Sequence, residues 1–155
     1  MAHNFKGNLS GEDLSIAIVV SRFNEFVTLR LLNGAKAALS KHGVLDDHLS
    51  IVDVPGSMEL GVAAKKLAGS GKFDSVICLG AVIRGETDHY EHVASEAAAA
   101  VSNISVETGV PVIFGVLTTD TVEQAINRAG GKNGNSGYNC GVTAIEMANL
   151  LRSLP

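Results

Sequence analysis

Four short, almost entirely apolar segments recur along the chain, and each is followed by a stretch with helical spacing. The segments cover residues 14–20, 49–54, 75–82 and 112–117, with the sequences LSIAIVV, LSIVDV, SVICLGAV and VIFGVL. A strand that is apolar on both faces must be buried on both, which is typical of a parallel sheet between two layers of helices. The pattern predicts an α/β, flavodoxin-like three-layer sandwich with a four-stranded parallel sheet.

The helices between these strands are marked by apolar periodicity and by their end signals. Residues 24–42 repeat apolar side chains at helical spacing, and Gly43 is expected to end that helix. Ser57 is expected to cap the next helix, and Asp120 with Glu123 to form a capping box farther along. Further helices are predicted over residues 57–67, 87–106, 121–129 and 138–154.

No linker, internal repeat or charge block divides the 155 residues, so residues 1–155 are expected to form one domain. The N-terminal segment AHNFKGN is too polar for the interior of the sheet. Two places are open to it as an edge strand: its own sheet and the sheet of a neighbouring subunit. The mean hydropathy of +0.23 is high for so short a chain and favours a homo-oligomer.

Charge and cysteine content exclude several classes of function. A net charge of −4 and a pI near 5.7 argue against nucleic-acid and membrane-surface partners. Cys78 and Cys140 are far apart without a Cys-x-x-Cys spacing, which indicates reduced, buried thiols of a cytoplasmic protein. The N-terminus has no apolar run typical of a signal peptide, and no segment approaches the roughly 20 apolar residues of a spanning helix.

The fold class indicates where a ligand should bind. Open parallel sheets hold ligands at the carboxyl ends of their strands. Polar, glycine-rich and aromatic residues gather at the ends of the first three predicted strands, in residues 21–24, 55–59 and 82–89. The sequence therefore predicts a site at this edge of the sheet.

The turn around Gly85 leads from a strand into a helix, which offers free N–H groups and a positive helix dipole to a phosphate. Glu86 and Asp88 place negative charge beside it, so phosphate binding and a plain tight connection both remain open. Arg128, before Gly130-Gly131-Lys132, could close over a phosphate or merely favour a helix C-terminus.

Three other candidates each have a functional and a structural interpretation. Phe23 either stacks on a planar ligand or packs onto Phe26. Glu59 either binds hydroxyl groups or favours a helix N-terminus. His89 and His92 are three residues apart, but zinc would need a third protein ligand, so we predict no metal and assign proton transfer to His89.

The alanine run at residues 97–100 presents small side chains on successive turns of the predicted helix over residues 87–106. It suits close packing on the sheet. It equally suits packing against symmetry mates around an axis.

Taken together, several motifs resemble the lumazine synthase family from about Ile16 to Leu151. Each motif alone is weak, whereas all of them in this order are a specific signature. The motifs are RFNEF at 22–26, VPGSMEL at 54–60, GAVIRGETDHYE at 80–91, FGVLTT at 114–119, EQAI at 123–126, RAGGKNGN at 128–135 and AIEMANL at 144–150.

The resemblance implies an enzyme without cofactor or metal. It would condense 5-amino-6-(D-ribitylamino)uracil with 3,4-dihydroxy-2-butanone 4-phosphate to 6,7-dimethyl-8-ribityllumazine, phosphate and water, the penultimate step of riboflavin biosynthesis. His89 would move protons and Arg128 would contact the phosphate. Phe23 would stack on the pyrimidine ring, and Glu59 would hold ribityl hydroxyls. The remaining substrate contacts implied by the resemblance are Asn24, Ser57, Met58, Val82, Ile83, Gly85, Glu86, Thr87, Phe114 and Lys132.

The resemblance also implies an assembly. Phe114 would come from an adjacent subunit, which would place the site between the subunits of a pentamer. The short loop 130–134 is similar to that of members whose pentamers close into icosahedral shells, with riboflavin synthase as the cargo of such a shell. The chain departs from the family pattern at Ser136, where members often have a lysine, and at Glu86, where a small or neutral residue is common.

Three rival functions belong to other classes. A noncatalytic flavin- or pteridine-binding shell protein would keep Phe23 and Glu59 without turnover, with Ser136 as its support. A nucleotide-binding protein would need a glycine-containing phosphate loop after the first strand, where residues 21–24 contain no glycine. A related archaeal-type riboflavin synthase would consume the lumazine as a substrate.

Overall fold

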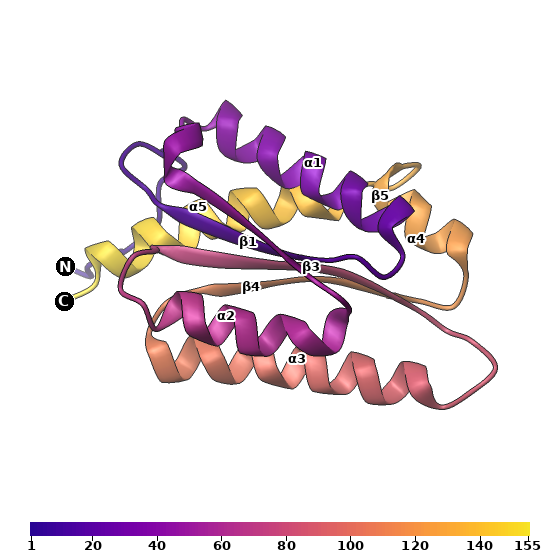
Figure 1. Ribbon diagram of the computed structural model, residues 1–155. Coiled ribbons are helices and arrows are strands. Elements are labelled where there is room, and N and C mark those ends of the chain that lie inside the picture. Colours follow the sequence, from indigo (N-terminus) through magenta and orange to yellow (C-terminus); the bar gives the residue numbers. More distant parts are fainter.

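The computed structural model describes residues 1–155 and confirms the predicted α/β sandwich (Figure 1). Its sheet has the strand order β2-β1-β3-β4, and every neighbouring pair is parallel. The strands are β1 (Ile16–Ser21), β2 (Leu49–Val54), β3 (Ser75–Ile83) and β4 (Val112–Thr119).

Helices cover both faces of the sheet, as the apolar strands require. α1 (Glu25–Lys41) and α5 (Ser136–Ser153) lie above the sheet in Figure 1, and α2 (Leu60–Ala68) and α3 (His89–Thr108) lie below it. The smaller elements are two 3-10 turns, η1 (Asp46–His48) and η2 (Ser57–Glu59), helix α4 (Val122–Arg128), and a hairpin of β5 (Ala129–Gly131) and β6 (Gly134–Asn135). No helix has both the length and the apolar character that crossing a membrane requires.

The core consists of two apolar clusters, one on each face of the sheet. In β1, Ile16, Ile18 and Val20 face the cluster under α1 and α5, while Ala17 and Val19 face the cluster under α2 and α3. Successive side chains of a strand point to opposite faces, so both sets are buried and the strand has no polar side. This burial explains the unbroken apolar run in the sequence.

Glycines allow α5 to pack unusually close to α1. A Cβ atom at Gly137 would overlap the carbonyl oxygen of Leu31. One turn later, a Cβ atom at Gly141 would lie 2.8 Å from the Cβ of Ala38. The two glycines are four residues apart, so they share one face of α5 and form a groove for the backbone of α1.

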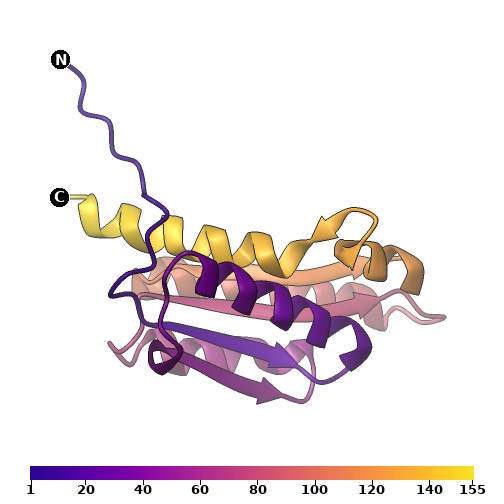
Figure 2. The same cartoon turned by 90° about the horizontal axis from the view of Figure 1, so that it is seen from above.

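The N-terminal segment forms no strand within the single chain and extends away from the sandwich (Figure 2). The end of this segment nearest β1 is held against α5, because Asn149 Nδ2 donates to the carbonyl oxygens of Asn8 and Ser10, both at 2.9 Å. Gly7 packs against the carbonyl oxygen of Glu146 with no room for a side chain. An edge strand on the chain's own sheet is therefore wrong, and a strand on a neighbouring subunit stays a prediction.

Two predicted helix caps are wrong. Ser57 does not cap a helix: it begins the 3-10 turn η2, and α2 starts three residues later without a side-chain cap. The capping box before α4 pairs Thr121 with Gln124 rather than Asp120 with Glu123. The Gln124 amide donates to the Thr121 hydroxyl at 3.1 Å, and the Gln124 side-chain oxygen accepts from the Thr121 amide at 3.3 Å.

The two cysteines are unpaired and buried, as the sequence predicts. Burial raises the pKa of the Cys78 thiol to about 12 and that of the Cys140 thiol to about 11, from an ordinary value of 9.0. The folded protein therefore keeps both thiol protons at a pH where the unfolded chain has released them. This contribution to stability is complete below pH 9 and is lost as the pH rises through the folded pKa values, about 11 for Cys140 and about 12 for Cys78.

We expect the free energy of unfolding to fall increasingly steeply above pH 9, towards about 2.7 kcal/mol per pH unit near pH 10, where the unfolded chain has released two protons, at about 1.36 kcal/mol each, that the folded protein keeps. Urea unfolding followed by circular dichroism between pH 8 and pH 10.5 measures this slope. The double variant Cys78→Ala/Cys140→Ala is the control, because it lacks both ionisations and should lose stability less steeply. Equal slopes in the two proteins would contradict the assignment of this pH dependence to Cys78 and Cys140.

Candidate active site

A cavity of about 440 Å³ opens at the carboxyl ends of the strands, on the side of the sheet covered by α2 and α3. It lies where the sequence predicts a site for this fold class. The turn after β1, the 3-10 turn η2, the end of β3 and the start of α3 form its wall. Nine predicted site residues line this one cavity: Phe23, Ser57, Met58, Glu59, Val82, Ile83, Gly85, Thr87 and His89.

The turn between β1 and α1 holds Phe23 out into the cavity. The Phe23 amide donates to the carbonyl oxygen of Pro55 at 3.1 Å, which joins the turn to the connection after β2. Asn24 adopts a left-handed conformation (φ 61°), which asparagine tolerates better than most residues, and its Nδ2 donates to the carbonyl oxygen of Ala81 at 2.8 Å. The Phe23 ring is 70 % exposed, so it is free to stack on a planar ligand.

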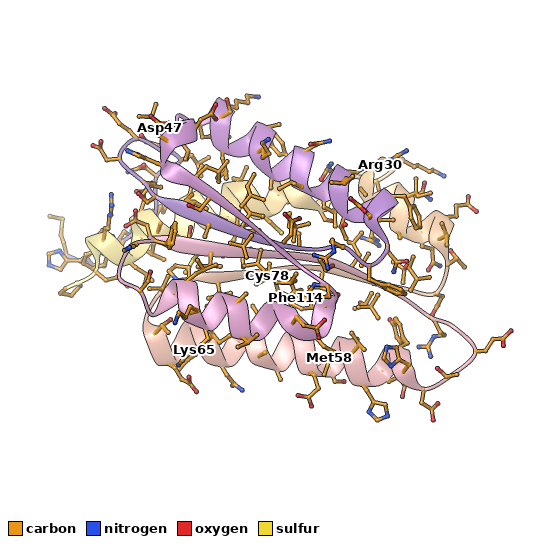
Figure 3. All side chains as sticks on the ribbon, in the orientation of Figure 1. Arg30, Asp47, Met58, Lys65, Cys78 and Phe114 are labelled. Atoms are coloured by element: carbon orange, nitrogen blue, oxygen red, sulfur yellow. The ribbon has the colours of Figure 1, made fainter.

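The connection between β2 and α2 supplies a carboxylate and a buried floor. Glu59 lines the cavity, and a Cβ atom at Gly56 would lie 3.3 Å from its carboxylate oxygen, so the glycine leaves room for this side chain. Ser57 is 93 % buried, and its hydroxyl lies over Gly80 of β3, where a Cβ atom would come within 2.6 Å. Met58, labelled in Figure 3, is half-exposed at the rim.

The start of α3 forms the opposite wall. Gly85 has no neighbouring atom within 4 Å of where a Cβ would lie, so its backbone is open to close approach by a ligand. The Thr87 hydroxyl accepts from the His89 amide at 3.3 Å, which fixes the first turn of the helix. The His89 side chain is exposed at the mouth of the cavity. The positive end of the α3 dipole is directed to the same space.

Five predicted site residues lie outside the cavity wall. Asn24 stabilises the turn between β1 and α1 through its hydrogen bond to Ala81. Glu86 projects into solvent beside Gly85. Phe114, labelled in Figure 3, is 40 % exposed and is the third residue of edge strand β4, away from the strand's carboxyl end. Arg128 ends α4, and Lys132 lies in the β5–β6 hairpin, which packs beside α1 (Figure 1). Within one chain these residues do not join the cavity.

The cavity also includes residues that the sequence analysis left unassigned, namely Pro55, Gly56, Ala81, Tyr90 and Val93. A usable signal existed for two of them. His89, Tyr90 and Val93 fall on one side of the first helical turns, so a role for His89 at a pocket mouth also places Tyr90 and Val93 there.

Arg84, also unassigned, connects three elements beside the cavity. Its Nε donates to the Asp120 carboxylate at 2.9 Å, its Nη1 lies 3.6 Å from the Glu91 carboxylate, and its guanidinium lies 4.4 Å from the centre of the Tyr90 ring. The hydrogen bond to Asp120 raises the pKa of Arg84 above its ordinary value.

The structure assembles no group of three or more His, Cys, Asp or Glu side chains that could hold a metal ion. The geometry is that of an open pocket with a stacking aromatic ring, a carboxylate for hydroxyl groups, a histidine and a helix N-terminus. Comparison with known protein families gives a match to the model of 6,7-dimethyl-8-ribityllumazine synthase over residues 13–152. The chain therefore belongs to the 6,7-dimethyl-8-ribityllumazine synthase family, and is accordingly a transferase of lumazine synthesis in riboflavin biosynthesis.

Proposed function

We propose that the chain condenses 5-amino-6-(D-ribitylamino)uracil with 3,4-dihydroxy-2-butanone 4-phosphate, and releases 6,7-dimethyl-8-ribityllumazine, phosphate and water. The observation that carries the proposal is the shared cavity of Phe23, Glu59 and His89, in a chain of this family. The aromatic ring suits a planar pyrimidine, the carboxylate suits the ribityl hydroxyls, and the histidine suits proton transfer.

The reaction forms an imine between the pyrimidine amine and the ketone with loss of one water, eliminates phosphate, and closes the second ring with loss of a second water. None of these steps needs a covalent enzyme nucleophile. Holding two substrates in a reactive geometry lowers the barrier by about 7–11 kcal/mol, whereas one general acid–base group contributes about 10²–10⁴-fold. We therefore assign the larger part of catalysis to positioning in the cavity and the smaller part to His89.

The phosphate contacts are proposed to come from two subunits. Gly85 and Thr87 lie at the cavity, with Glu86 beside them, whereas Arg128 and Lys132 lie on the α1 side of the same chain. A neighbouring subunit that presents its α4 and its β4 edge to the cavity would add Arg128, Lys132 and Phe114 to the site. This arrangement is why we propose that the working unit is a homo-oligomer.

We propose a pentamer, closing into an icosahedral shell with riboflavin synthase as the cargo. Exposed apolar side chains support a subunit interface: Val62 on α2 is 75 % exposed and Val106 on α3 is 83 % exposed. Ala98 and Ala99 of the alanine run also face outwards, while Ala97 packs in the core. The extended N-terminal segment is available to add a strand to a neighbour. The two free thiols fit a cytoplasmic enzyme.

The proposed reaction is tested by product identity. The protein is incubated with both substrates in one reaction and with the lumazine alone in another, and products are separated by chromatography and identified by mass. We expect lumazine to accumulate in the first reaction and to remain unchanged in the second. Conversion of added lumazine to riboflavin would instead assign the chain as a riboflavin synthase.

Arg128→Ala is expected to raise the Michaelis constant for the butanone phosphate about 10–100-fold, because a charge-assisted hydrogen bond contributes about 1.5–3 kcal/mol. The constant for the pyrimidine should change little, since the proposed contact is to phosphate. Steady-state kinetics with both substrates varied measure the two constants, and Lys36→Ala, an exposed cation on α1, is the control. An unchanged constant for the butanone phosphate would remove Arg128 from the site.

A further inference from the structure

The side chain of Arg84 occupies a junction that no step of the proposed reaction uses. It follows β3, and its backbone amide donates to the carbonyl oxygen of Thr119 at 2.8 Å, so its position at the strand end is fixed. From there the guanidinium reaches Asp120 before α4, and Glu91 and Tyr90 in the first turn of α3. A single side chain thus joins the starts of two helices.

Of these partners, Tyr90 faces the cavity. Its ring is half-buried in the wall, next to His89 and one helical turn before Val93. The guanidinium packs on this ring at 4.4 Å from its centre, which is within the range of a favourable cation–aromatic contact. The Arg84 side chain therefore packs against a residue of the cavity wall, Tyr90, without lining the cavity itself.

Global stability does not explain this network. Its charged side chains are well exposed, 47 % for Arg84 and 66 % for Asp120, and exposed ion pairs contribute little to folding. An ion pair of the same length, Arg152 with Asp74 at 2.9 Å, joins the end of α5 to the segment before β3, far from the cavity. The two pairs differ in that only Arg84 contacts a cavity residue.

We propose that Arg84 is a positioning residue that holds the Tyr90 ring, and with it the first turn of α3, in the geometry that binds the pyrimidine substrate. The hydrogen bond from Nε to Asp120 fixes the guanidinium, and the Tyr90 ring packs against it. Glu91 adds a longer charge contact from the same helical turn. The identity of the ligand rests on the proposed function, whereas the restraint on Tyr90 does not.

Tyrosine fluorescence tests the restraint directly, because the chain has no tryptophan and its two tyrosines are Tyr90 and Tyr138. In a Tyr138→Phe background, Tyr90 is the sole reporter. We expect Arg84→Met to raise acrylamide quenching of Tyr90 at least twofold and to lower its anisotropy. Arg152→Met, which removes the matched ion pair, should leave both unchanged. Unchanged quenching in Arg84→Met would overturn the proposal.

Kinetics test the consequence for binding. Arg84→Met is expected to raise the Michaelis constant for the pyrimidine about tenfold, equivalent to ~1.4 kcal/mol, with kcat within threefold and the same melting temperature. Arg84→Lys keeps the charge but not the planar group, so its Michaelis constant for the pyrimidine should lie between those of the wild-type protein and Arg84→Met. A lower kcat with an unchanged constant and a lower melting temperature would indicate a merely structural residue and overturn the proposal.

These measurements separate the positioning role from the proposed function. If wild-type protein forms no lumazine, the proposed function fails, while the quenching of Tyr90 still decides whether Arg84 holds the ring. If lumazine forms and quenching does not respond to Arg84→Met, the proposed function stands and the positioning role fails.

Discussion

His89→Ala is expected to lower kcat about 10²–10³-fold and to leave a slow rate that is still above the uncatalysed background. The side chain lies at the mouth of the cavity, where it can transfer protons, and a general acid–base group contributes about 10²–10⁴-fold. The cavity remains in the variant, so the larger contribution from substrate positioning is retained. Stopped-flow detection of lumazine fluorescence at saturating substrates measures both rates.

His92→Ala is the matched control for this variant. His92 is an exposed histidine three residues farther along α3 and does not line the cavity, so its removal should leave kcat unchanged. Partial recovery of the His89→Ala rate by added imidazole would support proton transfer. A folded His89→Ala protein with no activity at all would contradict the view that positioning dominates.

Gly137→Val is expected to prevent folding or to lower the free energy of unfolding by about 3 kcal/mol or more. A Cβ atom at this position would overlap the carbonyl oxygen of Leu31, and backbone cannot move aside as a flexible side chain can. To accommodate valine, α5 would have to separate from α1 and open the core cluster under both helices. Urea unfolding of the purified protein, or its absence from the soluble fraction, measures the effect.

Asn139→Val controls for the helix propensity of valine. Asn139 is exposed on the same helix, two residues away, so the same β-branched side chain should change stability by less than about 1 kcal/mol. Equal stability of Gly137→Val and Asn139→Val would contradict the close packing of α1 and α5.

The strands and long helices were predictable because burial on both faces leaves a direct mark on the sequence. The predicted segment 112–117 falls within β4, and Gly43 does end α1, with a positive φ of 98° just beyond the helix. The close α1–α5 contact was overlooked, although the four-residue spacing of Gly137 and Gly141 was a usable signal. Gly137 was assigned to the loop, because the helix was predicted from residue 138 and α5 begins at Ser136, whereas Gly141 already lay within the predicted helix.

The two wrong caps have physical reasons. Before α4, Asp120 with Glu123 and Thr121 with Gln124 both have the spacing of a capping box, and sequence alone does not choose between them. β4 continues to Thr119, which leaves Thr121 as the extended residue before the helix. For Ser57, burial against Gly80 takes the hydroxyl away from the helix amides, and a 3-10 turn intervenes.

The part of the site near the strand ends was predictable from the fold class. Parallel strands end at one edge, so Phe23, Glu59 and His89 had to come close together once the topology was known. The position of Arg128 was not predictable in this way. It depends on how α4 and the hairpin pack, and its proposed role also depends on the neighbouring subunit.

The most direct test of the central claim is a simultaneous record of lumazine fluorescence and phosphate release. Purified protein is mixed with 5-amino-6-(D-ribitylamino)uracil and 3,4-dihydroxy-2-butanone 4-phosphate in the presence of a chelator. We predict that lumazine and phosphate appear in a 1:1 ratio, as the proposed reaction requires, faster than without protein and unaffected by the chelator. Binding of the pyrimidine without formation of either product would contradict the assignment as an active synthase.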